Sequence, residues 1–449
     1  MPTKTPTRKA QVRRSDRVVA RLRFNHLLRI LGPGLITGAA DDDPSGIATY
    51  SQTGAQFGYS QIWTSLYQIP LLIAIQEACG RIGAVTGKGL AGVIKQHYSR
   101  RVLFVAVVLV VIANTINAGA DIGAVGSAVH LVVNVPVAYL VLMTAILVVL
   151  LEVFMSYRTY ARVLKWLALA LLAYPASALI VKEPWGQIIH ATIYPQLQLN
   201  FSFLFIIVGV FGTTISPYMF FWQTSGEVEE EISHRMVAQR GGIPRLTKTF
   251  LRNLRIDTTI GMVAAEIAQW FIIMTTATVL FSHGVKNIDS AAQAAQALQP
   301  LVKSFPDSGQ LAKDIFAVGI VGLGLLGIPV FAGSSAYAIS EALGWKEGLY
   351  RKFAKAKGFY GVIIISTLIG LSMNYLGINP IKALVYTAVL NGVAAVPLLF
   401  LIAKINGSKV ILGQYRGGLL SRAFVWLTFC VMALAAVAMF CTFIPSFRF

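Results

Sequence analysis

The chain has 449 residues, of which 56% are hydrophobic and only 13% are charged, and its formal net charge is +19. Soluble domains carry about 25% charged residues, so this composition, with a mean hydropathy of +0.67, excludes a set of soluble domains. It predicts an all-α integral membrane protein. The excess of basic residues alone would also suit a nucleic-acid-binding protein. The placement of the basic residues along the chain decides between a membrane protein and a nucleic-acid-binding protein.

Eleven apolar stretches are long enough to span a bilayer, which takes about 17–25 residues per helix. They lie at residues 34–58, 60–82, 102–133, 136–155, 161–181, 200–224, 256–282, 314–343, 359–376, 380–403 and 423–444. With the N-terminus in the cytoplasm, 32 of the 38 Lys and Arg residues fall on the cytoplasmic side, as the positive-inside rule requires. The basic charge is therefore an orientation signal. We predict a multi-pass protein of the plasma or inner membrane, whose partner is the lipid bilayer rather than nucleic acid.

Residues 1–30 form a basic stretch without the apolar core or small-residue cleavage site of a secretory signal. We expect this tail to be cytoplasmic and the short C-terminus, within 420–449, to be external. The three cysteines, Cys79, Cys430 and Cys441, fall in apolar stretches without metal-ligand spacing, so they predict neither a disulfide nor a metal site. We expect no cofactor, and we expect the chain to function as a monomer.

The first apolar stretch contains three consecutive acids, Asp41–Asp43, followed by Pro44-Ser45-Gly46. A carboxylate at membrane depth costs about 2.5–3.5 kcal/mol on insertion scales, so we expect these acids to have a function. Proline removes a backbone donor and glycine permits irregular φ and ψ, which frees carbonyl oxygens beside the carboxylates. Hard cations take both kinds of oxygen as ligands. The stretch therefore predicts a broken helix that holds a cation, although a short loop at the water interface also fits the pattern.

A second interruption, Ser216-Pro217, falls in the sixth stretch, five spans after the first. Five spans per unit place two units in opposite orientation, and paired interrupted helices point to a midplane site between inverted repeats. We predict a first repeat of five helices over residues 31–185, a second of five over 200–404, and one extra helix within 420–449. Two independent proline kinks would explain the same residues without a repeat.

The residues around both interruptions resemble the NRAMP family of divalent-metal transporters. That family opens its first helix with Gly-Pro-Gly and breaks it at Asp-Pro-Gly-Asn followed by Ile-Ala-Thr. Here Gly32-Pro33-Gly34 precedes Asp43-Pro44-Ser45-Gly46-Ile47-Ala48-Thr49, and the likeness continues through residues 76–90 and resumes at 212–217. The resemblance implies a LeuT-like fold, with helices 1 and 6 unwound at mid-membrane around the ion, and transport by alternating access.

The ligand set that the resemblance implies comprises an Asp, an Asn, a Met and backbone carbonyls, and this chain departs from it. Asp43 keeps the carboxylate, whereas Gly46 replaces the amide and Ser216 replaces the thioether. Soft thioethers favour transition metals, all-oxygen sites suit Mg²⁺, Ca²⁺ and Mn²⁺, and Mg²⁺ keeps several waters. We therefore predict a wider site for a partly hydrated Mg²⁺ or Mn²⁺ as the transported substrate, formed by Asp41, Asp42, Asp43, Gly46, Thr213, Ser216 and Tyr218.

The groups that carry protons in the family are replaced as well. Ala120 and Gly123 stand where the family's third helix has two acids, and Tyr218 and Gln223 stand where its sixth helix has two histidines. Asp121 is offset by one residue, about 100° around the helix, so we expect it to face elsewhere. The pattern resembles the NRAMP-related magnesium transporter branch and predicts uptake of Mg²⁺ and Mn²⁺ without protons.

Three other functions stay open. An ordinary proton-coupled Mn²⁺/Fe²⁺ symporter would need Asp121 as its relay. A LeuT-like transporter of an organic substrate, such as an amino acid, is disfavoured because three acids at the break would repel a carboxylate. A membrane enzyme is disfavoured because the sequence contains no His-Glu-x-x-His, nucleophile elbow or P-loop, and we predict no catalytic residue.

Overall fold

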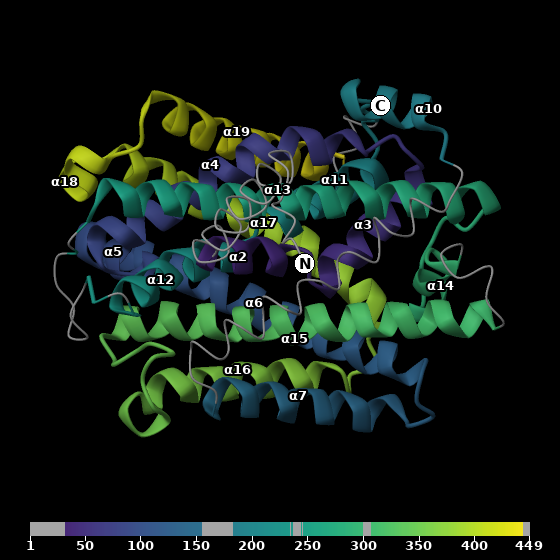
Figure 1. Cartoon of the computed structure of the whole chain (residues 1–449), viewed down its shortest axis with the longest axis horizontal. Helices are drawn as coiled ribbons and strands as arrows, with labels where there is room; N and C mark the ends of the chain where they lie inside the picture. Colours follow the sequence, from purple (N-terminus) through teal and green to yellow (C-terminus); the bar gives the residue numbers. More distant parts are fainter. Residues whose placement is uncertain are drawn as a thin grey trace, which may run out of the picture.

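The computed structural model describes residues 32–154, 183–233, 235–236, 244, 246–299 and 307–442, and within these ranges every regular element is a helix (Figure 1). The first part of the described chain contains α2 (Pro33–Asp41), α3 (Pro44–Phe57), α4 (Trp63–Thr86), α5 (Leu90–His97), α6 (Arg100–His130), α7 (Val137–Phe154) and α10 (Trp185–Ile193). The second part contains α11 (Phe201–Thr214), α12 (Pro217–Ser233), α13 (Lys248–Val279), η2 (Phe281–His283), α14 (Ala291–Gln296), α15 (Ser308–Leu343), η4 (Phe353–Lys355), α16 (Lys357–Met373), α17 (Pro380–Gly407), α18 (Lys409–Leu412), η5 (Gly413–Tyr415) and α19 (Leu419–Cys441).

The predicted spans that fall within the described residues are helices or, for the first and sixth spans, pairs of helices. Eight helical segments of the described chain are long and apolar enough to cross a bilayer. Neither α2 nor α3 reaches that length alone because the break divides the first span, and α16 is a shorter apolar helix. The predicted span 161–181 and the tail 1–30 lie outside the described residues, so the count of eleven stays a prediction.

Local sequence explains both breaks. Asp42 has φ −88° and ψ 39°, which is not helical, and Asp43 is extended and caps α3, with Pro44 in the first turn. At the second break Ile215 has φ −106° and ψ 63° after the end of α11, and Pro217 begins α12. Proline suits the first turn of a helix because its missing N–H would have no partner there. The prediction of two unwound helices is confirmed.

The two broken helices lie side by side at the centre of the bundle and run in opposite directions (Figure 1). The contacts show this arrangement, since α11 packs on α3 and α12 packs on α2. The packing of α4 on α12 has its counterpart in the packing of α13 on α3, and the long helices α6 and α15 pack along each other. A pseudo-two-fold axis that exchanges two inverted halves accounts for these paired contacts. The boundaries of the repeats stay predictions.

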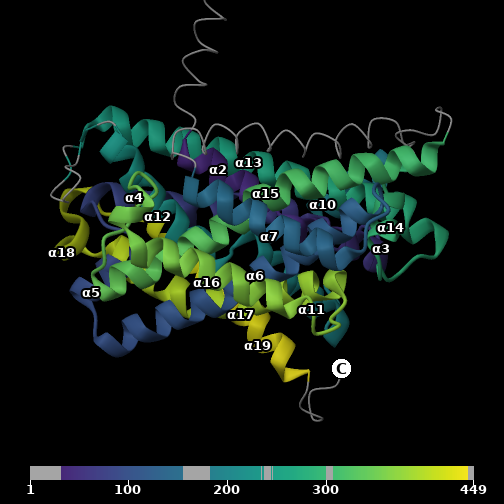
Figure 2. The same ribbon diagram turned by 90° about the horizontal axis from the view of Figure 1, so that it is seen from below.

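Short elements mark the two ends of the bundle. α5 and α18 lie at one end, and α10 and α14 lie at the opposite end, in both Figure 1 and the perpendicular view of Figure 2. α5 follows the second span and α18 follows the tenth, and both connections are predicted to face the cytoplasm. The connections that share a predicted side of the membrane therefore gather at one end, which we call the α5 end.

α2 approaches α13 very closely because both helices present glycine at the contact. A Cβ atom on Gly38 would lie 2.8 Å from the Cα atom of Gly261 and nearer still to its carbonyl group. Asp257 on α13 holds the start of α2, because its Oδ1 accepts from the N–H of Gly32 and its Oδ2 from that of Gly34, each at 2.8 Å. These bonds satisfy donors that the first turn of a helix leaves free, and they position the residues that lead into the break.

Candidate functional site

Asp43 uses one carboxylate oxygen for structure and leaves the other unused. Its Oδ1 accepts hydrogen bonds from the N–H of Gly46 and the hydroxyl of Ser45, each at 2.7 Å. Its Oδ2 is buried and has no hydrogen-bond partner. The N-terminus of α3 carries a partial positive charge, which favours a carboxylate at that position. Asp43 is therefore oriented by its first oxygen and offers the second to a ligand at the break.

Gly46 contributes close packing rather than a ligand side chain. A Cβ atom at this position would lie 2.8 Å from the carbonyl oxygen of Asp41 and 3.5 Å from the hydroxyl oxygen of Thr213. A larger residue would therefore push apart the two halves of the first broken helix. Because the N–H of Gly46 already binds Asp43, this residue shapes the break.

The second break supplies hydroxyl groups that already make hydrogen bonds. The Ser216 hydroxyl is shared between two carbonyl oxygens at the end of α11, and it lies 2.7 Å from that of Thr213. Tyr218 donates to the carbonyl oxygen of Ala40 at 2.7 Å, which joins the start of α12 to the end of α2. Thr213 Oγ1 lies 3.3 Å from Ser45 Oγ. The predicted residues of the two breaks are brought together, and their role as ion ligands stays a prediction.

Four carboxylates crowd the first break. Asp41, Asp42, Asp43 and, on α13, Glu266 are each at most 1% exposed. Both oxygens of Asp42 and both of Glu266 lack hydrogen-bond partners, and these two side chains interact electrostatically. None of the four forms an ion pair with another described residue. Buried charge without a partner is costly, so the cluster requires neutralisation by a cation or by protons.

Sequence reasoning missed Glu266. The signal was present, because this residue is a carboxylate inside the apolar span 256–282 and intramembrane acids mark functional sites. The sequence alone does not place α13 beside the break. The contact of α13 with both α2 and α3 does so.

Asp121 lies beside the first break, so the expectation that it faces elsewhere is wrong. A Cβ atom on Gly327 of α15 would lie 3.0 Å from Asp43 Cβ and 3.3 Å from Asp121 Oδ2, which places both acids around one point. Both oxygens of Asp121 are buried without hydrogen-bond partners. All residues from 117 to 126 are buried or nearly so. Protein therefore surrounds this part of α6. An offset of one residue, which is about 100° around the helix, directs a side chain toward a different neighbouring helix rather than toward lipid.

A chain of hydrogen bonds extends from the break across three further helices. Tyr50 Oη lies 3.0 Å from Thr214 Oγ1, and Thr214 donates to Gln269 at 3.2 Å. Gln269 in turn donates to Gln68 on α4 at 3.0 Å. Tyr50 also lies within electrostatic range of Glu266. The chain holds α3, α11, α13 and α4 in register around the acids, and it gives Gln68 an interhelical bond.

The arrangement suits a cation that keeps part of its water shell. Among the residues that the structure describes, no group of three His, Cys, Asp or Glu side chains is placed to hold a metal ion directly. The break instead offers the unused oxygen of Asp43, the hydroxyls of Ser45 and Thr213, and main-chain carbonyls. Such oxygens bind a hard cation directly or through its coordinated waters.

Comparisons with known proteins agree with this architecture. Residues 34–442 match the family described as natural resistance-associated macrophage protein-like. A divalent metal cation transporter MntH from Ralstonia nicotianae is 24% identical over 420 residues, which cover 92% of this chain and 90% of the relative.

Two solved structures share the fold. The Eremococcus coleocola manganese transporter, in complex with an aromatic bis-isothiourea substituted compound, has a TM-score of 0.73 at 18% identity and covers 95% of this chain and 90% of its own. MhsT in complex with L-phenylalanine has a TM-score of 0.58 at 10% identity and covers 91% of this chain and 98% of its own. The predicted all-helical, LeuT-like fold is confirmed.

Proposed function

The chain belongs to the natural resistance-associated macrophage protein-like family, and from this premise we propose that it carries divalent metal cations across a membrane by alternating access. The relatives support the substrate class, since one is named a divalent metal cation transporter and another a manganese transporter. The fold supports the mechanism, because paired broken helices hold the substrate near the midplane in transporters built from inverted repeats.

The observation that carries this proposal is the unused oxygen of Asp43. It is fully buried at the break of the first helix, without a hydrogen-bond partner, and the carboxylates of Asp41, Asp42 and Glu266 surround the same break. A cation seated there gains a direct carboxylate ligand and relieves the repulsion among the other acids. Asp43 is the proposed ligand, and Asp41 and Asp42 accept hydrogen bonds from the waters of the ion.

The proposed substrates are Mg²⁺ and Mn²⁺ in partly hydrated form. Ser216 places a hydroxyl where a thioether would favour softer metals, and Gly46 places no side chain where an amide would occupy the cavity. Thr213 and Tyr218 complete the proposed site from α11 and α12. Because few side chains reach the ion directly, its remaining positions belong to water, which Mg²⁺ releases reluctantly. No protein cofactor enters this proposal, and the metal is the cargo.

Proton coupling separates this proposal from a second candidate. The replacement of family acids and histidines by Ala120, Gly123, Tyr218 and Gln223 favours transport driven by the electrochemical gradient of the metal alone. The position of Asp121 beside Asp43 favours the second candidate, an ordinary proton-coupled Mn²⁺/Fe²⁺ symporter, because it places a titratable group next to the proposed ligand. An organic substrate remains a distant third, since the acids would repel its carboxylate.

The test is uptake into proteoliposomes that contain the purified full-length chain. Mg²⁺, Mn²⁺ and Ca²⁺ are compared while the lumenal pH is recorded and a potassium diffusion potential is imposed. An inside-negative potential supplies about 2.3 kcal/mol per charge per 100 mV, so uncoupled uptake of a divalent ion rises with the potential and leaves the lumenal pH unchanged. Absence of saturable uptake for every divalent cation would contradict the proposal.

We further propose that the protein sits in a plasma or inner membrane as a functional monomer, with its N-terminus in the cytoplasm and its C-terminus outside. The 32 of 38 Lys and Arg residues on the predicted cytoplasmic side support this orientation. Protease accessibility of tags at the two termini in sealed vesicles tests it.

A further inference from the structure

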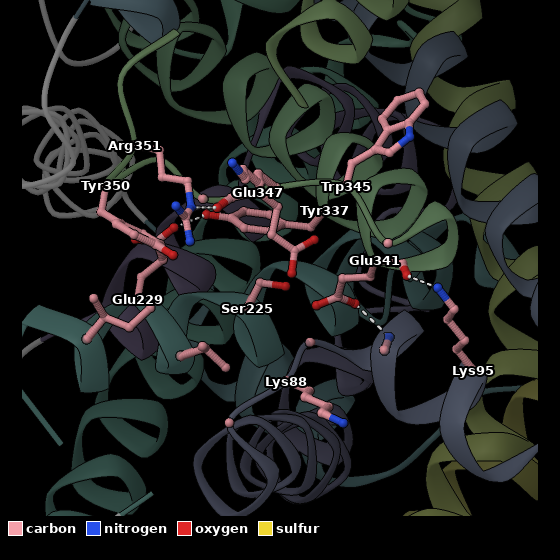
Figure 3. A pocket seen from close by; sticks show the side chains of 18 of the residues that line it. Lys88, Lys95, Ser225, Glu229, Tyr337, Glu341, Trp345, Glu347, Tyr350 and Arg351 are labelled. Atoms are coloured by element: carbon pink, nitrogen blue, oxygen red, sulfur yellow. Dashed lines mark hydrogen bonds between the residues drawn. The ribbon is translucent and has the colours of Figure 1, made fainter. Parts of the chain in front are cut away.

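Two cavities of the described chain lie at the α5 end of the bundle, and their linings differ in charge. The first, of 590 Å³, lies between α5, α12 and α15 and is lined by four basic and three acidic side chains. Figure 3 shows side chains of both signs around this space, and Lys95 donates to the main-chain carbonyl of Glu341 at 3.2 Å. The opposite charges largely offset one another, so this lining does not select a charged ligand.

The second cavity is an apolar groove of 470 Å³ formed by α6, α17 and Phe429 of α19. Its lining contains one charged residue, Arg101, and is otherwise apolar. Val105 is 51% exposed and Phe400 is 38% exposed, so the groove is open to the surroundings of the bundle. In a membrane protein those surroundings are lipid. We call this cavity the α17 groove.

The length of the α17 groove matches one leaflet of a bilayer. Along α6 the groove extends from Arg101 to Leu109, which is about 12 Å at 1.5 Å per residue. The hydrocarbon core of a bilayer is about 30 Å thick, so one leaflet contributes about 15 Å. The apolar wall therefore runs along most of one leaflet, as a site for an extended acyl chain requires.

Each of the three helices contributes one basic residue near the α5 end of the groove. Arg101 lies in the first turn of α6, which follows α5 directly, and Lys404 lies in the last turn of α17, which precedes α18. The Lys404 ammonium lies 5.2 Å from the centre of the Phe400 ring. Arg422 of α19 packs on the end of α17, because a Cβ atom on Gly407 would lie 3.6 Å from Arg422 Cδ. The basic groups therefore gather where the apolar wall ends.

These basic groups have no acidic partner within the described part of the chain. Arg101, Lys404 and Arg422 take no part in its ion pairs, and the Nε atom of Arg422 is buried without a hydrogen-bond partner. The sequence explains this lack of counter-charge. Residues 348–449 contain ten Lys and Arg residues and no Asp or Glu, and residues 100–120 also contain no acid. The three positive charges are therefore available to an anion from outside the chain.

We propose that the α17 groove binds one anionic phospholipid from the leaflet at the α5 end. An acyl chain lies along the apolar wall, and the phosphate lies between Arg101, Lys404 and Arg422. Basic pockets between membrane helices on the cytoplasmic side bind anionic headgroups, and the positive-inside rule predicts that the α5 end is cytoplasmic. Arg and Lys suit this position because their stems cover apolar surface while their charged ends stay at the interface. The site is independent of the proposed transport function.

Trp426 of α19 reports whether lipid occupies the groove. Its ring centre lies 5.8 Å from that of Phe400 and 5.7 Å from that of Phe429, two residues that line the groove. The probe is phosphatidylglycerol with brominated acyl chains, because bromine quenches tryptophan fluorescence at contact. The full-length protein is reconstituted into phosphatidylcholine vesicles with increasing fractions of this lipid. The chain has seven tryptophans, and subtraction of the signal of Trp426→Phe isolates that of Trp426.

Brominated phosphatidylcholine provides the neutral comparison. We expect half-maximal quenching of Trp426 at a mole fraction of brominated phosphatidylglycerol about tenfold lower than that of brominated phosphatidylcholine. Arg101→Gln and Lys404→Gln should each raise the mole fraction of the anionic lipid by about fivefold, because each removes one attraction to the phosphate. High salt should reduce the preference as well, since it screens charges at the interface.

The matched control is Arg252→Gln, which removes an exposed basic residue from α13, a helix that packs on α2, α3 and α4. Arg252 is also predicted to be cytoplasmic, so this variant lowers the overall charge of the same side without touching the groove. It should leave both mole fractions unchanged. Arg422→Gln serves as a further variant should Arg101→Gln melt at a lower temperature than the original protein.

Three results would overturn the proposal. Equal quenching by the two brominated lipids would mean that bulk lipid fills the groove without regard to charge. An equal loss of preference in Arg252→Gln and Lys404→Gln would assign the preference to the charge of the whole surface. Absence of quenching by either lipid would mean that protein, such as a second copy of the chain, covers the groove. A protein that prefers the anionic lipid but transports no metal would contradict the proposed function and support the lipid site.

Discussion

Asp121 on α6 and Asp43 at the break of the first membrane helix face the same point beside Gly327 of α15. A Cβ atom on that glycine would lie 3.0 Å from Asp43 Cβ and 3.3 Å from Asp121 Oδ2. The proposed ion ligand Asp43 therefore has a second buried carboxylate, that of Asp121, as a neighbour. Two such acids cannot both carry an uncompensated charge at low cost, and a cation or a proton must accompany them.

This pairing makes Asp121→Asn the decisive variant for proton coupling. If transport is uncoupled, metal uptake leaves the lumenal pH unchanged in the original protein and in Asp121→Asn, and both respond to a potassium diffusion potential. The physical reason is that the positions where the family has proton-carrying acids and histidines are occupied here by residues that do not titrate near neutral pH. These residues are Ala120, Gly123, Tyr218 and Gln223. A lumenal pH dye reads the result. Metal-dependent acidification that disappears in Asp121→Asn would establish the symport alternative.

A pair of substitutions at Asp43 separates ion binding from helix capping. Asp43→Asn and Asp43→Ala both remove the charge, and both should abolish saturable uptake. Asn keeps an oxygen that accepts from the N–H of Gly46, whereas Ala loses this cap, so Ala should be less stable than Asn by about 0.5–2 kcal/mol in the free energy of unfolding. Uptake assays and thermal melts of the two variants provide the measurements. Uptake at the original rate in either variant would remove Asp43 from the site.

Ser216→Met should move the selectivity toward Mn²⁺, because a thioether favours softer metals than a hydroxyl does. Competition of excess Mg²⁺ against tracer Mn²⁺ measures the change, and we expect Mg²⁺ to compete about tenfold less well, or about 1.4 kcal/mol. Ser216→Ala is the control, since it also loses the bonds to the carbonyls of α11 but adds no sulfur. If Mg²⁺ competes with Mn²⁺ equally well in Ser216→Met and Ser216→Ala, the thioether does not set the preference for softer metals. Adding Gly46→Asn would also disturb the backbone of the break, because a Cβ atom at this position would lie 2.8 Å from the carbonyl oxygen of Asp41.

Glu266→Gln should weaken ion binding although Glu266 lies outside both breaks. Its buried carboxylate interacts with Asp42, and its negative charge helps to attract the cation. We expect the half-saturating metal concentration for uptake to rise by roughly tenfold, equivalent to about 1.4 kcal/mol. Glu152→Gln is the matched control, because Glu152 is also a buried carboxylate but lies on α7. If both substitutions change uptake alike, the effect reflects the loss of any buried acid rather than the ion site.

Several features were determined by the amino-acid sequence alone, and each depends on short-range chemistry. Apolar length predicted the spans, and the proline after Asp43 and the proline after Ser216 predicted both breaks, because proline ends one helical segment and begins another. The acids beside the first break identified the candidate site. These signals lie within a few residues of the feature they predict, so a single chain displays them.

The tertiary structure decided which distant groups share the site. It placed Glu266 beside Asp42, brought Asp121 to Asp43, and turned the Ser216 hydroxyl onto the carbonyls at the end of α11. These relationships depend on which helices pack together and on how closely they approach, as at Gly327 on α15. Helical periodicity gives the direction of a side chain around its own axis, but not the neighbour that it meets. That neighbour is set by the packing of α6, α13 and α15 around the break.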